Sequence, residues 1–520
     1  MIIYNDDSDT LRRVDPPHDE QSITMPLRHL AGTQVGAICW GMDGGDIAYS
    51  WPSRVLESYY DRLGDREDPR NVMVGLHRKG IDYLPLLIQN ARSMNLKFYG
   101  SFRMNDCHHR SDPWGILSSK FWQEHQEYRL WDVTDARTYY NASLDYSFPE
   151  VRRRRLDAIR ETLQWYDFDG IELDFCRNPY IFPPTEAWAR RQILTDLIRQ
   201  IRQDMTDAGK KWGRTLDLLI RVPFSNSLRR NGGIDVDQWI DERLMDMLTM
   251  SCLSNDYNQI IEPWLTRCKQ ANIAFYPSVE AGPAHNAAHN HVTRLGPDEI
   301  IQQLRAAAQN FLGQGASGVY LYNFPCHLTE TRRTPEERHR ITNTLCEIGS
   351  EKTLSHRPKQ YTFWRELPMQ LESHRPAKHH QTLRFCLFDG DLWHPDTQVR
   401  ISLRQAVEPN PHVDTPPIDR LVDTLPPGWV TYWLNGRPVQ EEWIKRTPQP
   451  GGRIDSGFTL GDHETIILTP PASMMRVGEN TLGFYIPRFP EEHDPYANVY
   501  ELLVNILISS ADGSISSRPT

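Results

Sequence analysis

The stretch of sequence that decides the fold is Asp169-Gly-Ile-Glu-Leu-Asp-Phe-Cys-Arg-Asn-Pro179, in which apolar and acidic residues alternate. Side chains along a β-strand point to opposite faces in turn, so Glu172 and Asp174 share one face of this strand. The apolar residues between and beside them share the other face. We therefore predict a buried strand that packs its apolar face against helices and directs two carboxylates to the opposite side.

Apolar, β-rich runs of this kind alternate with helical patterns as far as residue 325. Strands that alternate with helices indicate βα units and a parallel sheet. The predicted strands are Val35–Trp40, Leu96–Arg103, Gly170–Phe175, Leu216–Val222, Met245–Ser251, Ile273–Val279 and Gly318–Phe324, with an eighth at Asn71–Leu76. Seven or eight units over about 300 residues favour a TIM-type (β/α)₈ barrel. An open doubly wound sheet is the alternative, but no G-x-G-x-x-G motif follows any of these strands.

The predicted helices have sequence signals of their own. Residues 149–166 have helical apolar spacing, and Ser147 and Glu150 form an S-x-x-E capping box at the start of this helix. A second helical pattern runs from Ile300 to Phe311, and we predict that Gly313 ends it.

The pattern changes after residue 349. Residues 350–380 are rich in Lys, His, Pro and Arg and are predicted to be a linker. Short alternating strands follow at Leu383–Phe388, Gln398–Leu403, Val430–Leu434, Thr465–Leu468, Thr481–Ile486 and Tyr500–Ile508, and Asn435-Gly436 signals a hairpin turn. The predicted organisation is an irregular segment over residues 1–33, a (β/α)₈ barrel over 34–349, the linker, and an all-β sandwich of the jelly-roll type over 381–512.

Composition excludes several classes of protein. The formal net charge of −10 argues against a nucleic-acid binder, which needs a basic surface. No run of 18 apolar residues exists, so no membrane-spanning helix is predicted. The N-terminus has no signal-peptide pattern, which predicts a cytoplasmic protein, although a mature secreted form would look the same.

Cysteine and histidine positions do not suggest a metal site. The eight cysteines have no CxxC or paired spacing, and several lie in apolar runs. His285, His289 and His291 have no carboxylate or cysteine that would complete a ligand set. We therefore predict neither a metal nor a cofactor.

The C-terminal strand ends of a parallel barrel are where its active site forms, and Asp174 lies near such an end. Glu172 lies one layer deeper and is suited to orienting or tuning Asp174. The alternative is structural, because buried acids need partners, and Arg103, Arg177 or Arg221 could pair with them.

The same segment resembles a known family. The string D-G-I-x-x-D-F-x-R-x-P is similar to the fourth-strand signature of the bacterial glycosyl-hydrolase-like family 10 and its relatives. It is matched by Asp169, Gly170, Ile171, Asp174, Phe175, Arg177 and Pro179. Leu144–Val151 and Phe102–Asp106 are also similar to that family. The resemblance spans residues 35–325 and implies a TIM barrel with glycosidase-type chemistry, without indicating a substrate.

A second similarity is to the family 18 chitinases, whose fourth strand carries D-G-x-D-x-D-x-E. Asp169, Gly170 and Asp174 match this pattern, but Cys176 occupies the position of the catalytic glutamate. A thiol does not protonate a leaving oxygen as a carboxylic acid does, so a chitinase mechanism is not predicted.

Glycoside hydrolysis uses two carboxyl groups across the scissile bond, so Asp174 needs a partner from another strand. Glu280, which follows the predicted strand Ile273–Val279, is our first choice, and Asp256 is the alternative. Glu280 could instead cap a neighbouring helix. If Asp174 and Glu280 converge over the barrel mouth, their chemistry should be retaining, whereas Asp256 would favour inversion.

Residues at other predicted strand ends are candidates for substrate binding. They are Trp40, Arg103, Asn105, Asp106, His108, Arg177, Arg221, Asn255, Tyr257, Tyr276, Tyr322 and Asn323. The arginines near one pocket hint at an anionic sugar, because a guanidinium binds oxyanions. Alternatively, they neutralise Glu172 and Asp174.

The sequence thus predicts a glycoside hydrolase that cleaves a poly- or oligosaccharide with paired carboxylates. Its predicted partner is a carbohydrate, with no nucleic acid and no membrane. One alternative is a carbohydrate-binding barrel that has lost activity, which Cys176 beside the acidic pair suggests. Another is a polysaccharide lyase, which would need a Tyr or His base. The sequence does not identify the sugar, the linkage, endo or exo action, or the oligomeric state.

Overall fold

A computed structural model describes most of the chain. The residues outside the described part are 12–13, 25–26, 67–70, 107–114, 132–142, 177, 252–258, 281–294, 326–332, 364–366, 368, 373–378, 409–428, 454–458, 462, 487–495 and 509–520. The chain forms two compact units. The first comprises Met1–Leu253, Glu262–Ala281 and Ala316–Gly349, and the second comprises Ser254–Ile261, Gly282–Gly315 and Ser350–Thr520.

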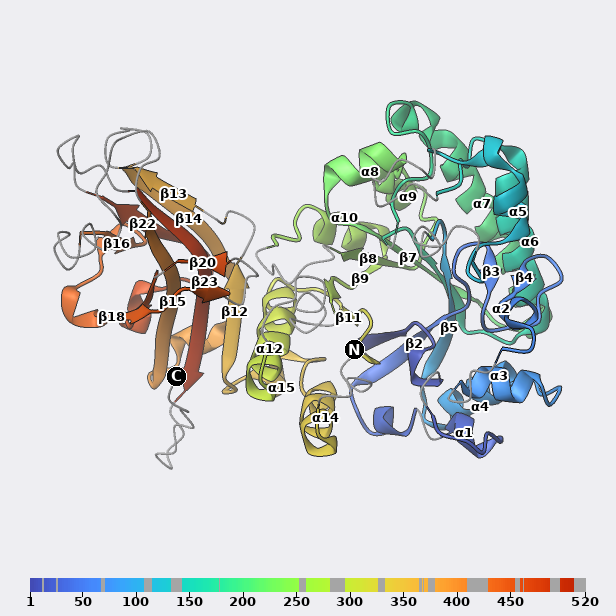
Figure 1. Cartoon of the computed structure of the whole chain (residues 1–520), viewed down its shortest axis with the longest axis horizontal. Coiled ribbons are helices and arrows are strands. Elements are labelled where there is room, and N and C mark those ends of the chain that lie inside the picture. The colour runs from blue at the N-terminus through green and yellow to red at the C-terminus, as the bar shows by residue number, and fades with distance from the viewer. Residues whose placement is uncertain are drawn as a thin grey trace. The chain divides into compact units, whose positions relative to one another are not determined.

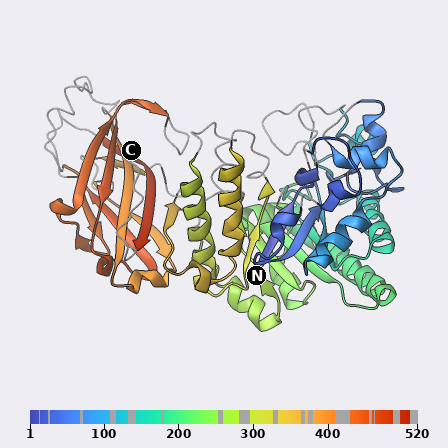
Figure 2. The same cartoon turned by 90° about the horizontal axis from the view of Figure 1, so that it is seen from below.

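The first unit contains a curled parallel sheet with helices around its outside (Figures 1 and 2). Its strand order is β10-β11-β1-β2-β5-β6-β7-β8-β9. The strands are β1 (Ile2–Asp6), β2 (Val35–Gly41), β5 (Lys97–Arg103), β6 (Gly170–Asp174), β7 (Asp217–Pro223), β8 (Met247–Ser251), β9 (Ala274–Phe275), β10 (Ser278–Val279) and β11 (Val319–Leu321). The predicted α/β class and curled parallel sheet are confirmed.

The two outermost strands of this sheet, β9 and β10, belong to one continuous stretch of chain. The Tyr276 N–H donates to the Leu248 carbonyl at 2.9 Å, and the Tyr320 N–H donates to the Pro277 carbonyl at 3.0 Å. Residues 274–279 therefore bond to β8 on one side and to β11 on the other.

The helices of the first unit bury the faces that their apolar spacing predicts. They include α1 (Gln21–Thr24), α2 (Tyr59–Leu63), α3 (Val72–His77), α4 (Leu84–Ser93), α5 (Lys120–Glu124), α6 (Pro149–Trp165), α7 (Ala187–Trp212), α8 (Asn226–Gly232), α9 (Val236–Asp241), α10 (Trp264–Ala271) and α14 (Pro335–Thr342). The predicted capping box of α6 is wrong, because Phe148 is the N-cap and makes no side-chain cap bond. The Ser147 hydroxyl instead accepts a hydrogen bond from Arg190.

Two other predictions for the first unit are wrong. Residues 2–6, assigned to an irregular segment over 1–33, form the fully buried strand β1 between β11 and β2. Asn71–Leu76, predicted as the eighth strand, is largely helix α3. The Asn71 side chain accepts a hydrogen bond from the Val74 N–H and so starts a helix there.

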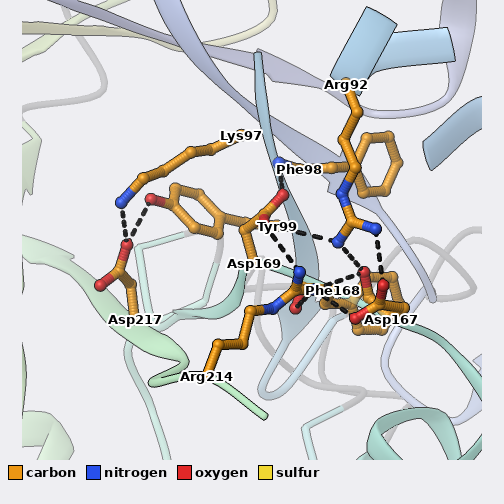
Figure 3. Close-up of polar contacts among 9 residues, drawn as sticks. All are labelled: Arg92, Lys97, Phe98, Tyr99, Asp167, Phe168, Asp169, Arg214 and Asp217. Atoms are coloured by element: carbon orange, nitrogen blue, oxygen red, sulfur yellow. Dashed lines mark hydrogen bonds and ion pairs between the residues drawn. The ribbon is translucent and has the colours of Figure 1, made fainter. Parts of the chain in front are cut away.

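Ion pairs tie together the N-terminal ends of β5, β6 and β7 (Figure 3). Asp169 accepts a hydrogen bond from the Phe98 N–H at 2.9 Å and lies 3.5 Å from the Arg92 guanidinium. Asp217 accepts hydrogen bonds from Lys97 at 2.6 Å and from the Tyr99 hydroxyl at 2.8 Å. Asp169, the first residue of the motif, therefore stabilises the end of the sheet opposite to the one where barrel active sites form.

The second unit contains two larger antiparallel sheets. One has the order β12-β23-β15-β21-β18, with β13 also pairing with β23, and the other has the order β14-β22-β16-β17. The strands are β12 (Lys359–Phe363), β13 (Met369–Glu372), β14 (His380–Leu387), β15 (Thr397–Glu408), β16 (Thr431–Leu434), β17 (Arg437–Pro438), β18 (Ile444–Gln449), β21 (His463–Leu468), β22 (Gly478–Tyr485) and β23 (Tyr496–Ile508). Buried apolar residues from both sheets form one hydrophobic cluster. A jelly-roll sandwich stays a prediction.

Two predicted assignments near the boundary between the units differ from the observed ones, although the division between residues 349 and 350 is the same. Residues 350–380 are not simply a linker, because β12 and β13 both pair with β23. Helix α12 (Pro297–Gly313), predicted as a barrel helix, belongs to the second unit, where Asn310 accepts a hydrogen bond from the Phe388 N–H at 2.8 Å. The Asn435-Gly436 hairpin is confirmed, since both residues have positive φ and join β16 to β17.

A buried ionic network holds β12 in the second unit. The Lys359 ammonium is fully buried, lies 2.5 Å from an Asp391 oxygen and 3.2 Å from an Asp389 oxygen, and has no contact with solvent. The Tyr361 hydroxyl donates to Asp389 at 2.8 Å. Both carboxylates therefore depend on one ammonium group for charge compensation. Among the described helices of the whole chain, none is long and apolar enough to cross a membrane.

Candidate active site

Alternate residues of the parallel strands line the interior of the curled sheet. An apolar cluster occupies part of it, formed by Ile3, Ala37, Cys39, Tyr99, Leu219, Met247, Tyr276, Tyr320 and Tyr322. Polar side chains occupy positions of the same parity closer to the C-terminal strand ends. They are Glu172 and Asp174 on β6, Arg221 on β7, Ser251 on β8 and Glu280 after β10, and all are buried.

Arg221 is the centre of this polar cluster. Its Nη1 atom lies 3.1 Å and 3.0 Å from the two oxygens of Asp174, and its Nη2 atom donates to the Ser251 hydroxyl at 3.0 Å. The guanidinium also lies over the ring of Tyr322, 3.8 Å from the ring centroid. Burial acts to lower the pKa of Arg221, but the nearby groups, with Asp174 the strongest of them, together outweigh burial and hold the pKa well above its ordinary range. Arg221 is therefore cationic at any pH at which the protein folds.

Glu280, which directly follows β10, lies beside the same guanidinium. One of its oxygens lies 3.6 Å from Arg221 Nη2 and accepts hydrogen bonds from Ser251 and, at 3.0 Å, from Ser278. The predicted pair of Asp174 and Glu280 thus meets at one arginine. Glu280 makes no helix cap among its described contacts.

Glu172 lies deeper and is unlike its two acidic neighbours. It is fully buried, and neither of its oxygens has a hydrogen-bond partner of standard geometry within the described residues. Burial first, and the charge of Asp174 second, raise its pKa from 4.5 to about 7. The nearby Ser101 and Tyr320 hydroxyls oppose this shift without cancelling it. Glu172 can therefore hold a proton near neutral pH, whereas a solvent-exposed glutamate cannot.

Two buried thiols border the acidic residues. The Cys176 N–H donates to Asp174 at 2.8 Å, which helps to orient that carboxylate. Burial raises the pKa of the Cys176 thiol to about 12, and burial together with Glu172 raises the pKa of Cys39 well above its ordinary value. Neither thiol is a thiolate at neutral pH, so neither is a nucleophile there.

A second ionic cluster lies at the ends of β1 and β5. Arg103 pairs with Asp7 at 2.5 Å and with Asp106 at 2.8 Å. Burial acts to lower the pKa of Arg103, but the charges of these two acids hold it well above its ordinary range. Tyr322, which lies against Arg221, also raises the pKa of Arg103, so the tyrosine is close to both clusters.

Other residues predicted to bind substrate make hydrogen bonds or packing contacts within the protein. Trp40 is buried, donates to the Ser50 hydroxyl at 3.1 Å and has the opposite parity to the interior-facing residues of β2. The Asn105 amide donates to the Leu144 and Tyr180 carbonyls at 2.8 Å. Tyr276 is part of the apolar cluster, and the buried Asn323 donates its N–H to the Asn5 side chain at 3.2 Å. His108, Arg177, Asn255, Asp256 and Tyr257 lie outside the described residues.

Several residues of the site were not among those predicted from the sequence. Ser251 and Ser278 both bind Glu280, and Asn5 and Asp7 come from the unpredicted strand β1 and its end. A usable signal existed in Met1–Asp7, where four apolar residues precede Asn-Asp-Asp, as at other strand ends. Within the described residues, no group of three or more His, Cys, Asp and Glu side chains is arranged to hold a metal ion.

Comparisons with known proteins give likenesses of fold only. No family model matches the chain, and no curated protein matches it by sequence. Solved structures that are similar include the PgaB (BpsB) glycoside hydrolase domain from Bordetella bronchiseptica, with a TM-score of 0.41 and 10% identity over 67% of this chain and 98% of that chain. They also include a glycoside hydrolase family 18 N-acetylglucosaminidase from Paenibacillus barengoltzii, with a TM-score of 0.34 and 13% identity over 66% of this chain and 98% of that chain.

A third similar structure is the maltogenic α-amylase AmyB from Thermotoga neapolitana, with a TM-score of 0.36 and 10% identity over 94% of this chain and 98% of that chain. Scores and identities this low do not establish a family. The resemblance to the glycosyl-hydrolase-like family 10 stays a prediction.

Proposed function

We propose that the protein is a glycoside hydrolase in which Asp174 and Glu280 form the catalytic pair. One observation carries this proposal: carboxylates from β6 and from the end of β10 meet at the same Arg221 guanidinium, near the C-terminal ends of the strands. Glycoside hydrolysis needs two carboxyl groups that face one substrate, and strand ends of a barrel supply them from different strands. The closed (β/α)₈ form of the barrel is part of the same proposal.

The roles of the two acids are a nucleophile and an acid/base, with retention of configuration. Glu172 would tune Asp174 from below, since the two carboxyl groups interact. Arg103 and Arg221 are already paired with carboxylates, so we favour a neutral over an anionic sugar as substrate. Tyr322 is buried and would support Arg221 through the ring face that packs against the guanidinium.

The decisive experiment is a reducing-end assay on plant, algal and microbial polysaccharides with wild-type protein and Asp174→Asn. We expect turnover by the wild type and a loss in kcat of about 10³-fold in the variant. Asp217→Asn is the matched control, because Asp217 lies in the ionic network at the other end of the sheet. Equal turnover by wild type and Asp174→Asn would contradict the assignment. For an active substrate, NMR of the first-formed anomer tests retention, and an inverted product would exclude this pairing as nucleophile and acid/base.

A carbohydrate-binding barrel without activity is the second candidate. It is favoured by the same Arg221, which compensates for both carboxylates and so supplies a purely structural reason for the acidic pair. This alternative predicts oligosaccharide binding in calorimetry without release of reducing ends, and a full binding signal for Asp174→Asn.

A further inference from the structure

Two aromatic side chains are exposed on the outer face of the four-stranded sheet in the second unit. Trp433 on β16 is 41% exposed and Tyr485 on β22 is 40% exposed. Their neighbours in sequence, Tyr432 and Phe484, point to the other face and are buried in the hydrophobic cluster. The exposed rings therefore do not belong to the core of the sheet.

Strand pairing places the two rings side by side on this face. Trp433 lies opposite Gly483, and Tyr485 is two residues further along the same strand, so Trp433 and Tyr485 are diagonal cross-strand neighbours. Such neighbours are about 7–8 Å apart, within reach of each other's rings. Strands β14, β22 and β16 are adjacent in the sheet (Figure 1).

Gly483 is the small residue over which Trp433 and His380 pack closely on this face. A Cβ atom at this position would lie 3.3 Å from the Trp433 Cβ and 3.6 Å from the His380 ring, so any larger side chain would fill this part of the face. The residue opposite Gly483 on the other side is Thr382, and Tyr485 lies between His380 and Thr431. All three of these polar residues are exposed.

The composition of this face suits a sugar better than a protein. It combines two aromatic rings with two threonine hydroxyls and an imidazole, which can donate to and accept from hydroxyl groups. The same face continues to the exposed Pro438, which lies opposite Trp433, and to the exposed Arg384 two residues after Thr382. The Tyr485 ring is supported by His379, whose ring centroid lies 5.8 Å away in an edge-to-face arrangement. This contact helps to hold the Tyr485 ring in place.

We propose that this outer face, defined by Trp433, Tyr485, Gly483, His380, Thr382 and Thr431, binds a neutral polysaccharide chain by stacking pyranose rings on Trp433 and Tyr485. The site is separate from the carboxylate cluster and contributes binding, not catalysis. This proposal rests on the proposed function only for the class of ligand, which is a carbohydrate. An assay that involves no hydrolysis tests it on its own.

The test is native gel electrophoresis of the full chain in gels that contain hydroxyethyl cellulose or glycol chitin, together with pull-down on microcrystalline cellulose and chitin. We expect the wild type to be retarded by one of these polymers. Trp433→Ala and Tyr485→Ala should each weaken retention about tenfold, which corresponds to about 1.4 kcal/mol. Trp393→Ala is the matched control, because Trp393 is 73% exposed in the same unit but lies in a short 3₁₀ helix outside this face.

The protein should also be tested as Asp174→Asn, so that binding is measured whether or not the enzyme is active. Retention of Asp174→Asn that depends on Trp433 supports the binding site even if no hydrolysis is found. A wild type that migrates unretarded in both gels and is pulled down by neither insoluble polymer would overturn the proposal. So would a Trp433→Ala variant that is retained as strongly as Trp393→Ala. A dimer that forms without polysaccharide and is lost in Trp433→Ala would also overturn it, since the face would then bind a second copy.

Discussion

The Nη1 atom of Arg221 lies 3.1 Å from one carboxylate oxygen of Asp174 and 3.0 Å from the other, so a single nitrogen bridges the whole carboxylate. The second terminal nitrogen of the same guanidinium reaches Ser251 at 3.0 Å and Glu280 at 3.6 Å. One cation thus compensates for two buried carboxylates from different strands.

Replacement of this cation is expected to destabilise the first unit strongly. Arg221→Met would remove the cation that contacts both Asp174 and Glu280, and breaking a buried ion pair by removing one partner typically costs about 3–5 kcal/mol of unfolding free energy. Urea denaturation measures the loss. The matched control is Arg199→Met, which breaks ion pairs on an exposed helix face and should change stability little. Adding Asp174→Asn to Arg221→Met should recover part of the loss, and strictly additive effects would argue against the shared contact.

Glu172 should make stability depend on pH. Its folded-state pKa is raised from 4.5 to about 7, so the folded protein keeps a proton that the unfolded chain releases. Stability therefore falls as the pH rises from about 4.5 to about 7, by roughly 3 kcal/mol at 1.36 kcal/mol per unit. Glu172→Gln removes this loss. The stability of this variant relative to the wild type should therefore be higher at pH 8 than at pH 5.

The comparison for this prediction is the difference between wild type and Glu172→Gln in urea melts at both pH values. Asp6 and Asp43 are also buried with raised pKa values, of about 7 and about 6, so the wild type keeps further pH dependence of the same sign. Asp6→Asn serves as the control that leaves the Glu172 contribution intact. Parallel stability curves for wild type and Glu172→Gln would contradict the prediction.

The two aspartates of the Asp169–Pro179 motif are expected to behave differently. Asp169→Ala removes the acceptor of the Phe98 N–H and should lower stability by about 1–3 kcal/mol, with kcat per folded molecule unchanged. Asp174→Asn should lose most of its kcat. It should also lose some stability, because Asp174 is paired with Arg221, so activity is normalised to the folded fraction from circular dichroism. If Asp169→Ala loses as much kcat as Asp174→Asn, the assignment of Asp169 to a structural role is wrong.

The network around Lys359 gives an independent prediction for the second unit. Lys359→Met leaves Asp389 and Asp391 buried without a cation and should cost about 3–5 kcal/mol of stability in that unit. Differential scanning calorimetry measures the effect. Lys352→Met, on an exposed position of the same region, is the control that should melt like the wild type. A Lys359→Met variant with an unchanged melting profile would contradict this prediction.

The elements that could be predicted are those whose pattern is local. Strand β6 and helix α6 show a two-residue and a 3.6-residue rhythm over their own length, so no tertiary information was needed. Strand β1 was not predicted, because a strand of five residues before a polar stretch is too short to show a clear alternation of apolar and polar side chains. Its pairing partners are also distant in sequence. Residues 71–76 were predicted to be a strand and are largely helical, because the Asn71 cap, and not the apolar spacing, decides the structure there.

For the site, the place of a residue along its own strand could be predicted from the sequence. The ion pairs between side chains of different strands could not. Parity on β6 placed Glu172 and Asp174 on one face, and a strand end placed Glu280 beside them. That Arg221 contacts both Asp174 and Glu280, while Arg103 turns to Asp7, depends on side-chain geometry between strands. No single-strand pattern encodes such choices.

Strand β1 has a consequence for how the chain is made. Its partner β11 is synthesised roughly 300 residues later, which at ribosomal speeds of about 5–20 residues per second is a delay of about 15–60 seconds. During that interval Ile2, Ile3 and Tyr4 have one edge without its native partner, and a nascent chain with an unpaired apolar strand is prone to aggregate. Expression at low temperature or with added chaperones should therefore raise the yield of native protein, because β1 cannot complete its pairing until β11 has been synthesised.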